Sequence, residues 1–210
     1  MDLSVSFPNK ETKTIEVPRG LGDIIATALR QGAMMETPSW RPIGFVLEDG
    51  GNMVHSMDYI LQDMVSVSSV LATSYFECQS NAEFLIVKTE FTNECKLSDI
   101  CKDGIELVSK DKVLVSSLKS TSVPITVIFR NSKGNFKIND NKKFIESKIN
   151  SSKDFVVLSS RHTPVVSFAT EVITKGEKDL INIDFETVNN DTTIIQRTVQ
   201  MLVDTLSSIA

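Results

Sequence analysis

The chain has 210 residues, of which 41% are hydrophobic and 23% are charged, and its formal net charge at pH 7 is −5. These values are ordinary for a globular protein with one large or two small domains. Lys and Arg are scattered, with no basic run longer than Lys142-Lys143, so we expect no autonomous binding to nucleic acid, which depends on clustered cations.

Three further features predict an intracellular protein. The segment Met1–Pro8 has neither the basic nor the apolar region of a signal peptide. The longest nearly uncharged stretch, 59–76, is too rich in Ser to span a bilayer. The chain has three cysteines, Cys78, Cys95 and Cys101. An odd number of cysteines, in a chain large enough to fold without disulfides, favours reduced thiols. We therefore expect a cytoplasmic or nuclear protein, or a virion protein if the source is a virus.

The N-terminal segment predicts two strands followed by a helix. Leu3–Phe7 and Thr12–Val17 alternate apolar and polar residues, and Pro18-Arg19-Gly20 ends the second strand. Apolar residues then recur at helical spacing from Leu21 to Leu29, and Gly32 is a candidate C-cap.

The next segment predicts a loop, a strand and an ambiguous stretch. Residues 38–42 contain two prolines and predict a loop, in which we interpret Trp40 as a packing residue in preference to an interface anchor. Ile43–Leu47 predicts a strand and 48–52 a turn. Residues 54–70 fit a short helix around 57–63 followed by a β-branched strand.

The middle of the chain, roughly 78–160, predicts a β-rich insert. Short β-type runs at 84–89, 112–118, 124–129 and 154–158 are separated by segments rich in Asn, Ser, Lys and Asp. The polar stretch 131–153 contains enough apolar residues that we do not expect disorder.

The C-terminal segment predicts a strand, a turn at 175–178, a second strand over 180–188 and a helix after an N-cap at 189–191. The helix carries an apolar stripe that continues to its end. A helix that covers its own sheet would explain part of this stripe, and a partner helix would explain the rest. The stripe consists of Ile195, Val199, Leu202, Leu206 and Ile209.

The residues that could support catalysis or metal binding lack the required spacing. The sequence spacing of His55 and His162, from each other and from any cysteine pair, does not match that of metal ligands. Gly20-Leu21-Gly22 has neither the third glycine nor the following Lys-Ser/Thr of a nucleotide-binding loop. We therefore expect no catalytic residue, metal or cofactor. A Cys–His nucleophilic pair, as in a small hydrolase, is the remaining enzymatic alternative.

Four stretches, taken in order, resemble the α-type assembly subunit of multisubunit DNA-directed RNA polymerases, which includes bacterial α and the third-largest archaeal and eukaryotic subunit. Lys13–Arg30, with Leu21-Gly22-Asp23, is similar to the family's motif in which Leu-Gly-Asn opens a helix ending in Leu-Arg-Arg. Residues 41–61 are similar to the next strand and helix, and His162–Phe168 to the return from the inserted domain. The most similar stretch, Lys178–Leu206, resembles the last strand and the dimerisation helix.

The chain also departs from the family pattern. Asp23 stands where the family often has Asn, Arg30-Gln31 replaces the paired arginines, and the metal-binding cysteine cluster of some relatives is missing. The abundant Ser and Asn are typical of a fast-evolving lineage, viral or organelle-like.

The resemblance implies an α+β fold: a discontinuous dimerisation domain of residues 1–76 and 160–210, with an antiparallel sheet and two helices, carrying a β-rich insert domain of residues 77–159. It implies a non-catalytic subunit of a nucleotidyltransferase complex that pairs with a second α-like subunit, as a homodimer or heterodimer, and nucleates assembly of the large subunits for transcription. No direct sequence-specific DNA binding and no membrane contact are expected. A β-grasp, ubiquitin-like binding module is the alternative that the N-terminal strand-strand-helix-strand order leaves open.

The same resemblance implies which residues take part. Arg30 would dock a large subunit, because a guanidinium can bridge to a carboxylate or a backbone carbonyl through two hydrogen bonds. The dimer interface would contain Leu21, Ile24, Ile25, Ala28, Ile195, Val199, Leu202, Leu206 and Ile209.

Overall fold

A computed structural model of the chain describes residues 4–6, 13–35, 37–47, 58–118, 120, 122–149, 154–188 and 193–209. Within these residues the fold is α+β, with antiparallel sheets and the helices α1 to α4. Contacts divide the chain into two compact units. Unit 1 contains residues 1–37 and 163–210, and unit 2 contains residues 38–162. Unit 1 is therefore built from both ends of the chain.

The first boundary between the units differs from the one expected at residues 76 and 77. The structure places residues 38–76 in unit 2. The reason is strand pairing, because β3 (Ser39–Leu47) pairs along its length with β9 (Val123–Ser132) of the same unit. The second boundary, at His162 and Thr163, lies close to the expected one.

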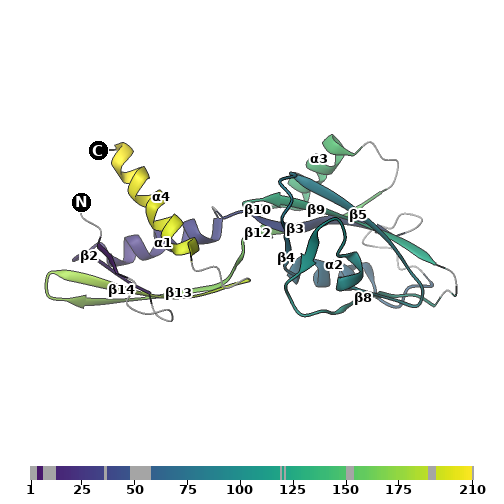
Figure 1. Cartoon of the computed structure of the whole chain (residues 1–210), viewed down its shortest axis with the longest axis horizontal. Coiled ribbons are helices and arrows are strands. Elements are labelled where there is room, and N and C mark those ends of the chain that lie inside the picture. Colours follow the sequence, from purple (N-terminus) through teal and green to yellow (C-terminus); the bar gives the residue numbers. More distant parts are fainter. Residues whose placement is uncertain are drawn as a thin grey trace. The chain divides into compact units, whose positions relative to one another are not determined.

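Unit 1 is a four-stranded antiparallel sheet with two helices on one face (Figure 1). The strand order is β1 (Ser4–Ser6), β2 (Lys13–Pro18), β14 (Lys178–Thr187) and β13 (Val165–Lys175). The helices are α1 (Gly22–Met35) and α4 (Thr193–Ile209). The expected C-terminal hairpin is confirmed, with Lys175 opposite Lys178.

The core of unit 1 joins the helices to alternate residues of the strands. Ile15 and Val17 of β2 and Ile181 and Ile183 of β14 are buried, as the period of two in their sequences predicts. The core is completed by Ala26, Leu29, Ala33, Val165, Phe168, Ile194 and Ile195. Both ends of the chain are therefore needed to form this core.

Helix α1 starts where a side chain from β14 reaches its first turn. Asp179 is buried and accepts hydrogen bonds from the backbone N–H groups of Gly20 (2.7 Å) and Gly22 (3.1 Å) and from Thr174 Oγ1 (2.7 Å). The hydrogen bond from Thr174 lowers the pKa of this carboxyl group, with smaller contributions from the two backbone donors. Asp179 therefore satisfies helix-terminal N–H groups with negative charge.

Gly32 does not cap α1 as expected, because the helix continues to Met35. A Cβ atom at this position would lie 2.6 Å from Thr198 Cγ2 and 3.1 Å from Met201 Cε of α4. Gly32 therefore allows close packing of α1 against α4.

Unit 2 is built around a six-stranded antiparallel sheet. Its order is β5 (Phe84–Phe91), β9, β3, β4 (Phe76–Cys78) and β7 (Ile105–Leu107), with β11 (Val156–Val157) also paired to β3. Helix α2 (Met64–Thr73) packs on one face and α3 (Ile138–Lys148) on the other (Figure 1). The alternation along β9 shows this, because Val127 and Phe129 pack in the core that contains α2, and Ile128 packs with Ile145 of α3.

Smaller elements complete unit 2. Strand β6 (Glu94–Lys96) pairs with β8 (Val113–Ser116), and β10 (Gly134–Phe136) pairs with β12 (Ser160–His162). A 3-10 helix, η1 (Leu97–Ile100), follows β6. The β-rich character expected for the middle of the chain is therefore present in this unit.

Three local expectations for unit 2 are wrong. Residues 39–42 begin β3 instead of forming a loop, although Trp40 is buried in the core as expected for a packing residue. The β-branched stretch after Asp63 forms α2 and not a strand. Of the short helix expected around 57–63, the described residues 58–63 form turns and a bridge between Ile60 and Ser117 instead. The polar stretch after 131, for which no element was predicted, contains α3.

Two expectations of local structure lie outside the described residues: the turn at 48–52 and the N-cap at 189–191. In the described part of the chain, no helix combines the length and apolar character needed to cross a membrane. The described residues also contain no group of three or more His, Cys, Asp or Glu arranged to hold a metal ion.

Candidate functional site

The expected dimer residues lie on the two helices of unit 1 and differ in how accessible they are. Ile24 is 67% exposed, whereas Leu21, Ile25 and Ala28 are half-buried. Ile195 is fully buried in the core of unit 1. The side chain of Ile195 therefore packs within its own chain and is not available to a partner.

The stripe on α4 is only partly covered by unit 1. Val199 and Leu202 are half-buried against its core. Leu206 and Ile209 belong to α4, but their side chains are not among those that the structure describes. The sheet of unit 1 therefore covers the start of the stripe. Val199 and Leu202, further along α4, keep some apolar surface accessible.

Helix α1 presents an apolar ridge on the side opposite its buried face. Ile24, Ala28 and Met35 are four and seven residues apart, so they lie on one line along the helix. Met35 is 44% exposed and Ala28 is half-buried. We call Ile24, Ala28 and Met35 the α1 ridge. Ile24 and Met35 are therefore large exposed apolar side chains on one side of α1, with the small, half-buried Ala28 between them, which is typical of an interaction surface.

Arg30 is placed where a docking residue could act. It is exposed on α1, on the flank of the helix that also carries Asp23 and Thr27. Within the described part of the chain, its guanidinium makes no hydrogen bond or ion pair. The five N–H donors of Arg30 can therefore all face solvent or a partner.

His162, a candidate partner in the Cys–His pair of the enzymatic alternative, is held by hydrogen bonds inside unit 2. His162 is fully buried, its Nε2 lies 2.8 Å from Ser160 Oγ, and its Nδ1 lies 2.9 Å from the Ser39 carbonyl oxygen. Asn141 extends this network by donating to Ser160 Oγ (2.9 Å) and to the Leu158 carbonyl oxygen (2.8 Å). Burial lowers the pKa of His162 to about 4. Both ring nitrogens are engaged without a thiol, and no substrate can reach them.

Two of the three cysteines lack the properties of nucleophiles. Cys95 is fully buried, and burial raises the pKa of its thiol to about 12. Burial also raises the pKa of Cys101, and Cys78 is half-buried. Since nucleophilic cysteines require a lowered pKa and access to substrate, Cys95 and Cys101 do not support a hydrolase. His55 lies outside the described residues.

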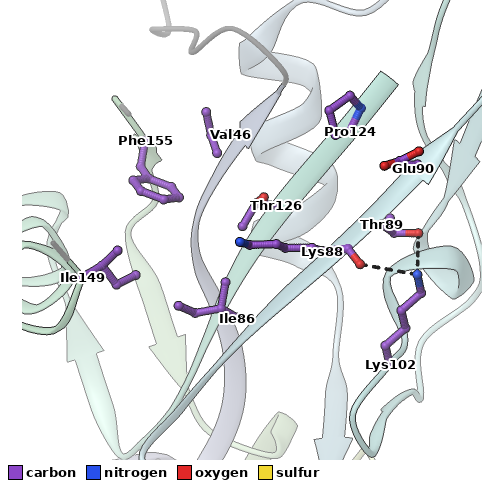
Figure 2. A pocket seen from close by; sticks show the side chains of 10 residues that line it. All are labelled: Val46, Ile86, Lys88, Thr89, Glu90, Lys102, Pro124, Thr126, Ile149 and Phe155. Atoms are coloured by element: carbon purple, nitrogen blue, oxygen red, sulfur yellow. Dashed lines mark hydrogen bonds between the residues drawn. The ribbon is translucent and has the colours of Figure 1, made fainter. Parts of the chain in front are cut away.

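A hollow in unit 2 was not foreseen from the sequence. It has a volume of about 780 Å³ and lies over the sheet face formed by β5, β9 and the end of β3 (Figure 2). The floor and walls contain Val46, Ile86, Lys88, Thr89, Glu90, Lys102, Pro124, Thr126, Ile149 and Phe155.

The lysines of this hollow differ in their contacts. The ammonium group of Lys102 donates to Thr89 Oγ1 (2.9 Å) and to the Lys88 carbonyl oxygen (3.4 Å). The Lys88 side chain extends over the apolar floor beside Ile86 and Thr126 (Figure 2). Among the described residues, no carboxylate lies within ion-pair distance of Lys88. In the sequence, Lys88 is followed by Thr89 and Glu90, so it does not differ from an ordinary polar residue of a strand and no local signal indicated the hollow.

A scan against protein-family models and a search of curated protein sequences gave no match to this chain.

Proposed function

We propose that this chain is a non-catalytic assembly subunit of a DNA-directed RNA polymerase, which pairs with a second α-like subunit through the helices of unit 1. In this role the pair nucleates assembly of the large subunits, which hold the catalytic centre. Arg30 contributes to docking a large subunit. The chain supplies apolar area and positioning, and no catalytic group.

The observation that carries this proposal is the layout of unit 1. Both ends of the chain form one antiparallel sheet, and α1 and α4 cover a single face of it. A second compact unit is inserted between α1 and β13. A sheet from both ends of the chain, two helices on one face and an inserted unit agree with what the resemblance implies, although residues 38–76 belong to unit 2 and not to the first domain. The α1 ridge lies on one of the two helices that such a dimer would use.

The β-grasp alternative is less well supported by the strand pairing. A β-grasp domain would need the strand after α1 to join the sheet of β1 and β2. Strand β3 instead belongs to the sheet of unit 2, and β14 is the neighbour of β2. The N-terminal segment therefore has no closed sheet of its own.

The first test is the behaviour of the chain expressed alone. Exposed apolar surface on α1 and α4 is expected to make it self-associate or precipitate. Multi-angle light scattering measures this directly. A pull-down from the native source, followed by mass spectrometry, should recover two very large chains. A well-behaved monomer that recovers neither of them would contradict the proposal.

A substitution in the α1 ridge makes this test specific. Ile24→Glu should abolish pairing, because it places a charge in a dry interface, yet it should not affect folding since Ile24 is 67% exposed. Leu118→Glu in unit 2 is the matched control, since Leu118 is also 67% exposed. Leu202→Asp should abolish pairing as well, but Leu202 is half-buried within the chain, so its folding must be verified.

A further inference from the structure

The outer edge of the unit 2 sheet has backbone groups that no described strand uses. Among the described strands, β5 is the terminal one of the sheet and pairs only with β9. The N–H of Asn131 in β9 donates to the Glu83 carbonyl oxygen (2.9 Å), so the odd-numbered residues direct their backbone groups toward β9. Backbone groups alternate in an antiparallel strand, so those of Phe84, Ile86 and Lys88 point outward.

One contact provides independent evidence for this orientation. The Lys88 carbonyl oxygen accepts a hydrogen bond from Lys102 Nζ, a side chain from outside the sheet (3.4 Å). Lysine side chains at sheet edges commonly discourage unwanted pairing. In the described part of the chain, the outward groups of Phe84 and Ile86 have no such cover.

The side chains of these outward-pointing residues lie on the face that contains the hollow. Ile86 and Lys88 line it, whereas Val87 between them is fully buried in the core on the other face. A strand placed beside β5 would have its same-face side chains next to Ile86 and Lys88, about 5 Å away between Cβ atoms. The edge and the hollow would therefore be used together by a single extended segment.

We propose that β5 is a docking edge for an extended segment of a partner protein, which adds a strand to the unit 2 sheet. The segment carries an acidic side chain opposite Lys88 and an apolar side chain two residues away, opposite Ile86. Backbone hydrogen bonds provide affinity, and the side chains in the hollow provide specificity. This surface is separate from the helices of unit 1 and does not depend on their proposed role.

Charge complementarity favours an acidic residue at this position. The Lys88 ammonium has no carboxylate within ion-pair distance among the described residues. Glu90, the acidic residue of the hollow, accepts a hydrogen bond from Ser122 Oγ (2.9 Å). Lys102 is exposed, so its ammonium group can leave the Lys88 carbonyl and join the same carboxylate. An incoming acid would then meet two cations.

The test uses a synthetic peptide whose pattern is the same in both directions, so that parallel and antiparallel pairing are covered. The probe is acetyl-Thr-Val-Thr-Glu-Thr-Val-Thr-amide, added to the full-length chain and followed by NMR chemical-shift changes. Every sample carries Ile24→Glu, so that pairing through unit 1 does not precipitate the chain. One comparison peptide has Lys in place of Glu. Another is N-methylated at each of its Thr, Val and Glu amides, which removes the donors that would face β5 in either direction of pairing.

We expect the Glu peptide to bind the chain with Lys88 intact about tenfold more tightly than the Lys peptide, because opposed cross-strand charges attract and like charges repel. Lys88→Glu should reverse this order. Lys110→Glu, the same charge change at an exposed lysine outside the hollow, should preserve it. The N-methylated peptide should not bind.

Four results would overturn the proposal. They are equal affinity for the Glu and Lys peptides, binding of the N-methylated peptide, no binding of any peptide to the chain with Lys88 intact, and self-association through this edge. The last would appear as a dimer that Lys88→Glu dissociates, and it would assign the edge to a second copy. Loss of pairing in Ile24→Glu would not affect any of these readouts.

Discussion

At the residue scale, the contact between Gly32 and α4 predicts that replacing this glycine lowers the stability of the protein, although glycine replacements in helices usually raise it. Gly32→Ala in a helix normally stabilises by about 1 kcal/mol. Here the new Cβ atom would lie 2.6 Å from Thr198 Cγ2, and Thr198 is held by its hydrogen bond to the Ile194 carbonyl oxygen (2.9 Å). Overpacking of this kind costs about 1–3 kcal/mol. We therefore expect a net loss of about 1 kcal/mol in urea denaturation.

The neighbouring position provides the control for this prediction. Gln31 is exposed on the same helix, so Gln31→Ala should change the free energy of unfolding by less than about 0.5 kcal/mol. A stabilising effect of Gly32→Ala would show that α1 and α4 are not in close contact at this point.

The carboxyl group of Asp179 predicts part of the acid sensitivity of unit 1. Its pKa is lowered in the folded chain, first by the hydrogen bond from Thr174. The stabilisation is therefore fully present above the unfolded pKa, near 4, and is lost as the pH falls through the lower folded value. We expect the stability difference between wild type and Asp179→Asn to be constant at neutral pH and to shrink below about pH 4.

Urea denaturation from pH 2 to pH 7 measures this difference. Asp184→Asn serves as the control, because Asp184 is exposed on the same strand. An unchanged difference between wild type and Asp179→Asn down to pH 2 would contradict the assigned hydrogen bonds.

At the element scale, sequence periodicity predicted the elements of unit 1 well. The strands and helices of this unit have one buried and one exposed face, so hydrophobicity alternates with the correct period. For example, Ile181 and Ile183 are buried between half-buried or exposed neighbours. The position of Gly32 inside α1 was not predictable, because it depends on contact with a helix that is distant in sequence.

Local propensity failed where tertiary packing decides the structure in unit 2. The prolines suggested a loop before Ile43, yet Pro42 fits into β3 because the register shifts between Pro42 and Gly44. The β-branched stretch forms α2 because Asp63 caps it, accepting from the Ser66 N–H (2.6 Å). Burial of Met64, Val67 and Leu71 on one side of that helix outweighs β propensity.

The interaction surfaces were predictable only in part. Ile24 could be identified from helical spacing, and the structure places it at the surface. The burial of Ile195 could not be predicted, because the spacing of apolar residues along the helix does not show which of them contact the chain's own sheet and which remain at the surface. The hollow beside Lys88 arises from three strands that are distant in sequence, so no local pattern could reveal it.

The strand β12 contains a buried histidine that predicts pH-dependent stability. Burial lowers the pKa of His162 to about 4, whereas an unfolded histidine has a pKa near 6.5. The unfolded chain therefore takes up the proton first, and stability is complete above about pH 6.5 and falls as the pH decreases toward 4. The loss reaches about 3 kcal/mol over this range.

The measurement compares His55→Gln with the double variant His55→Gln, His162→Gln, so that the second histidine does not contribute. The double variant should be less stable at pH 7 and should lack this part of the pH dependence. Identical slopes between pH 5 and pH 6.5 would mean that His162 is not buried as the structure shows.

At the scale of the whole molecule, the two units differ in how they are built from the chain. Unit 2 is a continuous segment with its own core on both faces of its sheet. Unit 1 depends on pairing between β2 and β14, which come from opposite ends of the chain. The segments that enter and leave unit 2 are adjacent, since His162 Nδ1 lies 2.9 Å from the Ser39 carbonyl oxygen. A short connection should therefore replace unit 2.

We expect a shortened chain, in which a Gly-Ser-Gly linker replaces residues 38–162, to fold. It retains the four strands, α1 and α4, and the buried residues that join them. Removal of only 78–158 should instead give an aggregating protein, because it keeps β3 without β9 and leaves Trp40 and Phe45 without their core. Circular dichroism and dispersion of the amide NMR signals distinguish the two outcomes. If the shorter deletion folds and the longer one does not, residues 38–76 belong with unit 1, and the boundary lies near residue 76.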